Sequence, residues 1–246
     1  PCRKCPDIQQ HLKWGHRWAR EVRELERVRN RYDSRTGSVA RQFDRICNVL
    51  EELGYLRRAE GSVDGQVDYR LTEQGQLLRH LYSELDLVLA QAIDDGAFDG
   101  LDAAELASVV MSLIYEPRRG GGGEPRHYPG GIQGNVAVCA AQLKGVHASI
   151  AMLCEDHALG EMRQLDFGIT DVVYEWAQGE SLSRVLCGTD LTGGDFVRSC
   201  KRLADVLQQI AVAGPYLGER AETLVPIAKQ AYESVNRGIV AYSGVD

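Results

Sequence analysis

The sequence predicts a mainly α protein, a helical bundle with a long N-terminal stalk helix and a small winged-helix-like β-hairpin. Three observations support this prediction. Aromatic residues make up only 7% of the 246 residues, and helix formers such as Leu, Ala, Glu, Arg and Gln dominate long stretches. Apolar residues recur at spacings of three and four, as in amphipathic helices. A single turn-rich segment, residues 60–65, lies between two short β-like runs.

Charge divides the chain into a basic arm and an acidic body. Residues 1–58 contain 14 Lys and Arg against 8 Asp and Glu, whereas the remaining residues contain 14 basic against 27 acidic side chains, a net of −13. Tight, autonomous binding of nucleic acid needs clustered cations. Any nucleic-acid role is therefore expected to be local, or shared with a more basic partner. The hydrophobic fraction of 44% excludes a disordered chain.

Cysteine usage and hydropathy predict a cytoplasmic protein. The chain has seven cysteines with no regular spacing after the first pair, which is typical of reduced thiols. No signal peptide is present, no apolar run approaches the length of a membrane span, and no membrane partner is expected. The chain starts at Pro1 within a charged segment, so we expect it to be a piece of a larger protein.

Residues 1–35 predict a basic helical stalk. From Ile8 to about Tyr32, apolar residues lie three and four apart, with Arg and Glu between them. Such a helix usually packs against one partner. Residues 33–38 are expected to break it, with Ser38 capping the next helix.

Residues 36–76 predict a winged-helix-like segment. A helix over 38–53 stops at Gly54, as a residue after a helix C-terminus should. Two short strands then flank the Asp64–Gly65 turn, and Thr72 caps the following helix. Helix, hairpin and helix in this order are typical of a winged helix.

Residues 77–246 predict a helical bundle. Asp102 and Glu105 form a capping-box pattern at the start of one of its helices. The glycine-rich stretch over 117–131 predicts a flexible surface loop. The expected helices cover about 72–95, 102–115, 136–159, 170–178, 182–187, 194–213 and 218–242.

Motifs for catalysis are absent from the sequence. The glycines at 120–123 do not form a phosphate-binding loop, because no Gly-Lys pair follows them. Hydrolytic nucleophile motifs are also missing. Cys2, Cys5 and His11 are weak candidates for a zinc site, but the spacing between the second Cys and His11 is short for a zinc finger. Two reduced thiols at a helix entrance are favoured instead.

The helix at about 194–213 is the most informative one. Its apolar residues form one broad face, while Arg198, Arg202, Asp205 and Gln209 lie four, three and four apart in one polar stripe. An Arg-containing stripe is suited to lining a channel, because the guanidinium offers a planar donor fork to a base or phosphate. A solvated face with Arg–Asp pairs fits the same pattern.

The segments 172–182, 189–191 and 194–203 closely resemble the DSHCT domain, the C-terminal region of superfamily 2 DExH-box RNA helicases of the superkiller and exosome-associated type. Residues 83–116 resemble the start of this domain, and 237–243 its end. The preceding part, with Cys2-x-x-Cys5-Pro6, is similar to the actinobacterial branch, and this resemblance implies that residues 1–35 are the end of an arch-like insertion.

This resemblance implies an accessory domain that supports single-stranded RNA, or DNA, at the exit of a RecA-like motor in the same polypeptide. ATP and Mg²⁺ would bind to the motor, and the fragment alone would hold no cofactor and catalyse nothing. The 194–213 helix corresponds to the ratchet helix that faces the RNA. The implied nucleic-acid-binding residues are Arg202, Arg198, Glu116, Lys201 and Gln209.

Two other functions fit the same sequence. The first is a winged-helix DNA-binding transcription regulator with a helical C-terminal domain, because residues 69–75 are similar to the wing exit of such proteins. However, the helix over 38–53 offers only Arg41, Gln42 and Arg45 to DNA. The second is a purely structural or protein-docking bundle, in which Arg198 and Arg202 do not touch RNA.

Overall fold

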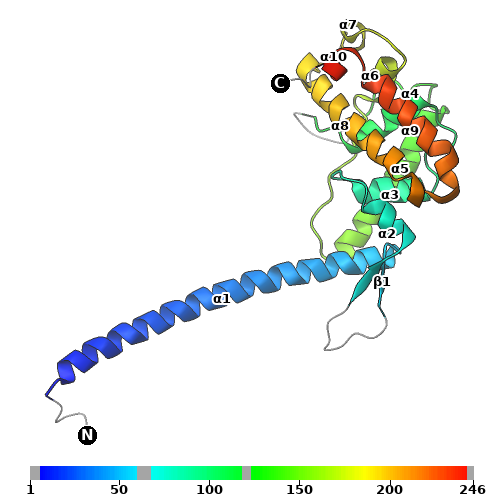
Figure 1. Cartoon of the computed structure of the whole chain (residues 1–246). Coiled ribbons are helices and arrows are strands. Elements are labelled where there is room, and N and C mark those ends of the chain that lie inside the picture. The colour runs from blue at the N-terminus through cyan, green and yellow to red at the C-terminus, as the bar shows by residue number, and fades with distance from the viewer. Residues whose placement is uncertain (1–5, 60–67, 118–122, 243–246) are drawn as a thin grey trace. The chain divides into compact units, whose positions relative to one another are not determined.

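The computed structural model describes residues 6–59, 68–117 and 123–242, and it confirms a mainly α protein (Figure 1). The chain divides into two compact units, residues 1–48 and 49–246. The helices are α1 (Ile8–Glu52), α2 (Glu73–Leu78), α3 (Asp86–Asp94), α4 (Ala103–Val110), α5 (Asn135–Asp156), α6 (Thr170–Ala177), α7 (Leu182–Val185), α8 (Gly193–Val212), α9 (Ala221–Val235) and α10 (Gly238–Tyr242). The strands are β1 (Leu56–Arg58) and β2 (Tyr69–Leu71), and short 3₁₀ turns are η2 (Met111–Leu113), η3 (Gly214–Tyr216) and η4 (Gly218–Arg220).

The N-terminal helix α1 is continuous over 45 residues. The expected break at residues 33–38 is therefore wrong, and Ser38 lies inside the helix. The segment contains weak helix formers but no proline, and one glycine in a helix costs only about 1 kcal/mol relative to alanine. This cost is too small to interrupt a long helix that the residues on both sides favour. The predicted domain limits at residues 35 and 76 stay predictions.

The predicted hairpin is present directly after α1. Its strands pair antiparallel, with Leu56 opposite Leu71, and Gly54 has the positive φ of +81° that ends a helix. The Thr72 hydroxyl donates to the Gly54 carbonyl oxygen at 2.7 Å and accepts from the Gly75 N–H, so it joins the hairpin to α2. The expected Asp64–Gly65 turn lies outside the described residues.

Two of the expected long helices are interrupted. The one expected over 72–95 splits into α2 and α3, because the N–H of Tyr82 donates to a side chain of α8. The one expected over 218–242 splits into η4, α9 and α10. Arg237 lies in the break between α9 and α10, and its guanidinium donates to the carbonyl oxygens of Trp176 and Glu180. At Tyr82 a tertiary contact takes the place of a backbone bond within a helix, whereas at Arg237 the tertiary contacts come from the side chain. By contrast, the capping box of Asp102 and Glu105 is confirmed at α4.

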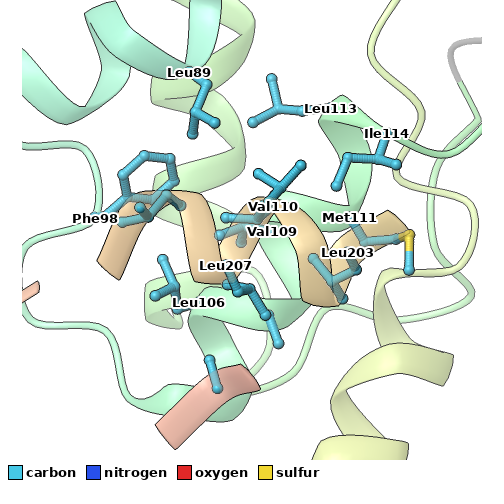
Figure 2. Packing of buried hydrophobic residues seen from close by; sticks show 14 of the residues in the cluster. Leu89, Phe98, Leu106, Val109, Val110, Met111, Leu113, Ile114, Leu203 and Leu207 are labelled. Atoms are coloured by element: carbon cyan, nitrogen blue, oxygen red, sulfur yellow. The ribbon is translucent and has the colours of Figure 1, made fainter. Parts of the chain in front are cut away.

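Helix α4 lies at the centre of the core of the second unit, where it packs against α5, α6, α8 and α9. Of its eight residues, all but Glu105 are buried. Figure 2 shows Leu106, Val109 and Val110 in one cluster with Leu203 and Leu207 of α8. This packing holds α8 from its apolar side.

Helix α5 is long and apolar enough to cross a membrane, with a mean hydropathy of 1.5 over 18 residues. This differs from the expectation that no apolar stretch approaches that length. One such helix is weak evidence for a membrane span, because the core helices of other proteins meet the same criterion. Six side chains of α5 are buried among the other helices: Val136, Cys139, Ala140, Leu143, His147 and Ile150.

Residues 123–131 of the predicted loop form no helix or strand, as expected, and side chains distant in the sequence contact this part of the loop. Gly123 exchanges hydrogen bonds with the Asp166 carboxylate and the Phe167 N–H. The Glu124 carboxylate accepts from Lys144, and Arg126 forms an ion pair with Asp171. Side chains distant in the sequence thus fix this glycine-rich segment.

Candidate nucleic-acid interface

Helix α8 has one buried and one exposed face, as its sequence predicts. It begins after Thr192, whose hydroxyl accepts from the N–H of Asp195. Arg198, Arg202 and Asp205 are exposed along one stripe. Gln209, in the same stripe, is partly buried. The side chains of the opposite face are buried: Phe196, Val197, Cys200, Leu203, Val206, Leu207 and Ile210.

The neighbouring helices fix the position of this stripe. In Figure 1, α8 and α9 run side by side, and their contact is the most extensive between any two of the described elements. Leu203 and Leu207 contribute to the same cluster as the α4 side chains of Figure 2. A helix packed in this way presents its polar side chains on a rigid support.

The structure brings together Arg202 and Glu116, two residues predicted separately. The Arg202 Nη2 lies 3.7 Å from the Glu116 Oε1, and the two side chains are 50% and 47% exposed. Arg202 comes from the middle of α8, whereas Glu116 follows η2 at the end of the α4 segment. An exposed ion pair of this kind contributes about 0–1 kcal/mol to stability. Both groups are thus accessible to a ligand at little cost.

Arg163 holds the backbone directly before Glu116. Its guanidinium donates to the carbonyl oxygens of Leu113 and Tyr115, and its Nε lies 2.9 Å from the Glu84 carboxylate. Sequence reasoning missed this residue, because its partners lie about 50 and 80 positions earlier and no local motif surrounds it. Arg163 is a positioning residue for Glu116.

Arg198 and Lys201 occupy different positions relative to the stripe. Arg198 lies at its N-terminal end, is 73% exposed, and forms an ion pair with Asp195 one turn earlier. Lys201 is partly buried and lies at the margin of the stripe, given the helical repeat of 100° per residue. Their roles in nucleic-acid binding stay predictions.

Gln209 ends the stripe at its C-terminal side. Its Oε1 accepts from the backbone N–H of Tyr82 at 2.7 Å. The amide oxygen is therefore engaged within the protein, which the sequence pattern does not indicate. This bond also brings Tyr82, a residue that sequence reasoning missed, to the end of the stripe.

Comparison with known proteins identifies the family. The sequence model of the DSHCT (NUC185) domain matches residues 68–243. The chain belongs to the DSHCT domain family. The match covers α8 with its polar stripe, Glu116 and Arg163, so the whole candidate interface lies inside the DSHCT domain.

Similar proteins include helicases from several kingdoms. "Probable helicase HelY" of Mycobacterium leprae is 34% identical over 249 residues, which are 96% of this chain and 25% of that protein. "Superkiller complex protein 2" of Homo sapiens is 26% identical over 230 residues, 90% of this chain and 17% of that protein. "DExH-box ATP-dependent RNA helicase DExH10" of Arabidopsis thaliana is 23% identical over 250 residues, 98% and 23% respectively.

The chain therefore spans about a quarter or less of the length of these relatives. The predicted similarity to the superkiller type and to its actinobacterial branch is confirmed.

Two thiols of the DSHCT domain, Cys139 and Cys200, lie in the core. Burial raises the pKa of the Cys139 thiol to about 12, and burial also raises the pKa of the Cys200 thiol on the buried face of α8. Both thiols stay protonated at neutral pH and act as small apolar side chains. Among residues 6–59, 68–117 and 123–242, no cluster of His, Cys, Asp and Glu could hold a metal ion. The candidates Cys2 and Cys5 lie outside these ranges, and His11 is exposed on α1.

Proposed function

We propose that this DSHCT domain supports single-stranded RNA beside the ATP-driven motor of a larger helicase and catalyses no reaction by itself. ATP and Mg²⁺ would act in RecA-like domains of the same polypeptide, in the cytoplasm. Names of similar proteins such as "DExH-box ATP-dependent RNA helicase" support this assignment. The exposed stripe of α8 would face the strand.

The Arg202–Glu116 pair is the observation that carries the proposal. Handling RNA of any sequence requires contacts that every nucleotide can satisfy, such as phosphate charge and the plane of a guanidinium. Arg202 can turn from Glu116 to a phosphate or a base without losing a buried partner, because both side chains are half exposed. Glu116 would accept hydrogen bonds from base amino groups or from a 2′-hydroxyl group.

The acidic body fits a strand that must move. A net charge of −13 over residues 59–246 repels phosphate, so the local Arg contacts are opposed by the field of the domain. Weak contacts release easily at each step of translocation. We therefore expect the 246-residue chain to bind single-stranded RNA more weakly than nanomolar at physiological salt, and nanomolar binding would contradict this part of the proposal.

The mass of the native gene product is the first measurement. An antibody raised against this chain should detect a band several times larger than 27 kDa in cell lysate. A band near 27 kDa would remove the motor from the proposal. The winged-helix transcription regulator would then be favoured.

Substitution of Arg202 in the full-length gene product tests the interface. Arg202→Ala should leave basal ATPase activity unchanged and raise the RNA concentration for half-maximal stimulation about 10-fold, the value of one charge-assisted hydrogen bond. Arg184→Ala is the matched control, because Arg184 is an exposed Arg of α7 that pairs with Glu180 and lies outside the stripe.

Two outcomes would contradict this interface. If Arg202→Ala behaves like Arg184→Ala, the stripe does not bind RNA. If the double charge reversal Arg198→Glu and Arg202→Glu leaves stimulation and unwinding untouched, the domain is a structural or protein-docking bundle. Repeating the assay with single-stranded DNA shows whether the 2′-hydroxyl group matters.

A further inference from the structure

An exposed tyrosine is bonded to the polar stripe through its backbone. Tyr82 is in the break between α2 and α3, and its side chain is 74% exposed. Its neighbours Leu81 and Leu85 are each 2% exposed and belong to the core. The backbone is thus anchored on both sides of a ring that itself contributes little to the core.

A hydrogen bond ties Tyr82 to α8. Its N–H donates to the Gln209 Oε1 at 2.7 Å, and Gln209 lies on the same stripe as Arg202. Seven residues separate Gln209 from Arg202, which is about 10 Å along the helix axis. Tyr82 therefore sits two turns beyond Arg202 on the course of the stripe.

A stacked pair of rings fixes the segment before Tyr82. His80, at the end of α2, stacks on Tyr216 of η3 with ring centroids 4.7 Å apart and an angle of 28°. The His80 Nδ1 donates to the Gln76 carbonyl oxygen at 2.7 Å. This stack joins the segment before Tyr82 to the turn after α8, so the Tyr82 backbone is held from two directions.

We infer that Tyr82 is a base-stacking residue that extends the single-strand path beyond Arg202. The inference rests on the proposed function of the α8 stripe. Every base has a π-face, so an exposed aromatic ring on a fixed backbone binds single strands without sequence preference. Arg202 would hold the phosphate or base of one nucleotide, and Tyr82 would stack on a base further along the strand.

The test compares Tyr82→Ala with three other variants in the full-length gene product. Tyr82→Phe keeps the ring, and Arg202→Ala probes the stripe. Tyr242→Ala is the control, because it removes a different exposed tyrosine, which lies in α10 and is 82% exposed. The readout is the concentration of oligouridylate that gives half-maximal ATPase stimulation. Tyr82→Ala should raise it at least about 5-fold, Tyr82→Phe less than about 2-fold, and Tyr242→Ala not at all.

The outcomes separate this inference from the proposed function. If Arg202→Ala weakens RNA binding but Tyr82→Ala matches Tyr242→Ala, stacking is wrong and the stripe stands. If both substitutions are without effect, the proposed function fails as well. Equal losses in Tyr82→Ala and Tyr82→Phe would mean that the hydroxyl group, not the ring, binds RNA.

Photocrosslinking tests the contact between Tyr82 and RNA directly, without a substitution. Oligouridylate carrying 5-iodouridine should form photocrosslinks to the peptide that contains Tyr82 in the unaltered protein. Crosslinks confined to other peptides would overturn the inference, even if Tyr82→Ala fails to fold.

Discussion

Replacing Arg163 by alanine removes the side chain that fixes the backbone before Glu116. The guanidinium is 22% exposed, donates to two carbonyl oxygens, and pairs with Glu84. Hydrogen bonds from a charged donor contribute about 1.5–3 kcal/mol each, whereas the ion pair with the half-exposed Glu84 contributes about 0–1 kcal/mol. Because water can reach part of the site, we take the lower end and expect a loss of about 3 kcal/mol in the free energy of unfolding.

Urea denaturation of the 246-residue chain, followed by circular dichroism, measures this loss. Glu84→Gln is the matched control, because it removes the ion pair but leaves both carbonyl bonds, and it should cost no more than about 1 kcal/mol. Amide hydrogen exchange over residues 111–117 should accelerate in Arg163→Ala only. If Arg163→Ala costs no more than Glu84→Gln, Arg163 does not position Glu116 through the carbonyl oxygens.

Three further substitutions test the core, a close backbone contact and a pH-dependent pair. Leu203→Ala, at a fully buried position of α8, should lower the free energy of unfolding in urea by about 2–5 kcal/mol. Gly75→Ala should lower it by about 1–3 kcal/mol, since a Cβ there would overlap the Tyr55 carbonyl oxygen; an unchanged urea midpoint would contradict that contact. Lys144 lowers the pKa of Glu124 from its ordinary value of 4.5, chiefly by a side-chain hydrogen bond. A carboxylate whose pKa is lowered by folding stabilises the folded protein above pH 4.5, and this stabilisation is lost as the pH falls below 4.5. The difference in Tm between wild type and Lys144→Met should therefore narrow from neutral pH to about pH 3.

Features that depend on neighbours in the sequence could be predicted. The buried and exposed faces of α8 follow from the 3.6-residue repeat, and the broad apolar face expected on this helix is buried. Capping by Asp102 and Thr72 requires partners only three residues away, so the two helix starts are read correctly. The pairing of Arg202 with Glu116 is different, because only the resemblance to a family singled out Glu116.

Features that depend on distant partners could not be predicted. The break at Tyr82 arises from a bond to Gln209, 127 positions away. Gly123 of the glycine-rich loop donates to Asp166, a buried carboxylate about 40 positions later. Local propensity does not indicate either contact, because the energy of both comes from tertiary structure.

Two Arg–carboxylate pairs of the domain differ in how readily their side chains can separate. The Arg126 Nε lies 2.6 Å from the Asp171 carboxylate, whose side chain is fully buried. Breaking this pair would leave the buried Asp171 carboxylate without its Arg partner, which costs more than separating two exposed groups, although the Arg126 side chain itself is 43% exposed.

Arg202 and Glu116, 3.7 Å apart and half exposed, can separate at a cost of about 0–1 kcal/mol. In the proposed function, such a pair would let Arg202 exchange its carboxylate for a phosphate and return when the strand moves. The proposed role of Arg202 therefore requires the low energy of its ion pair, whereas Arg126, with the same functional group, holds a buried carboxylate.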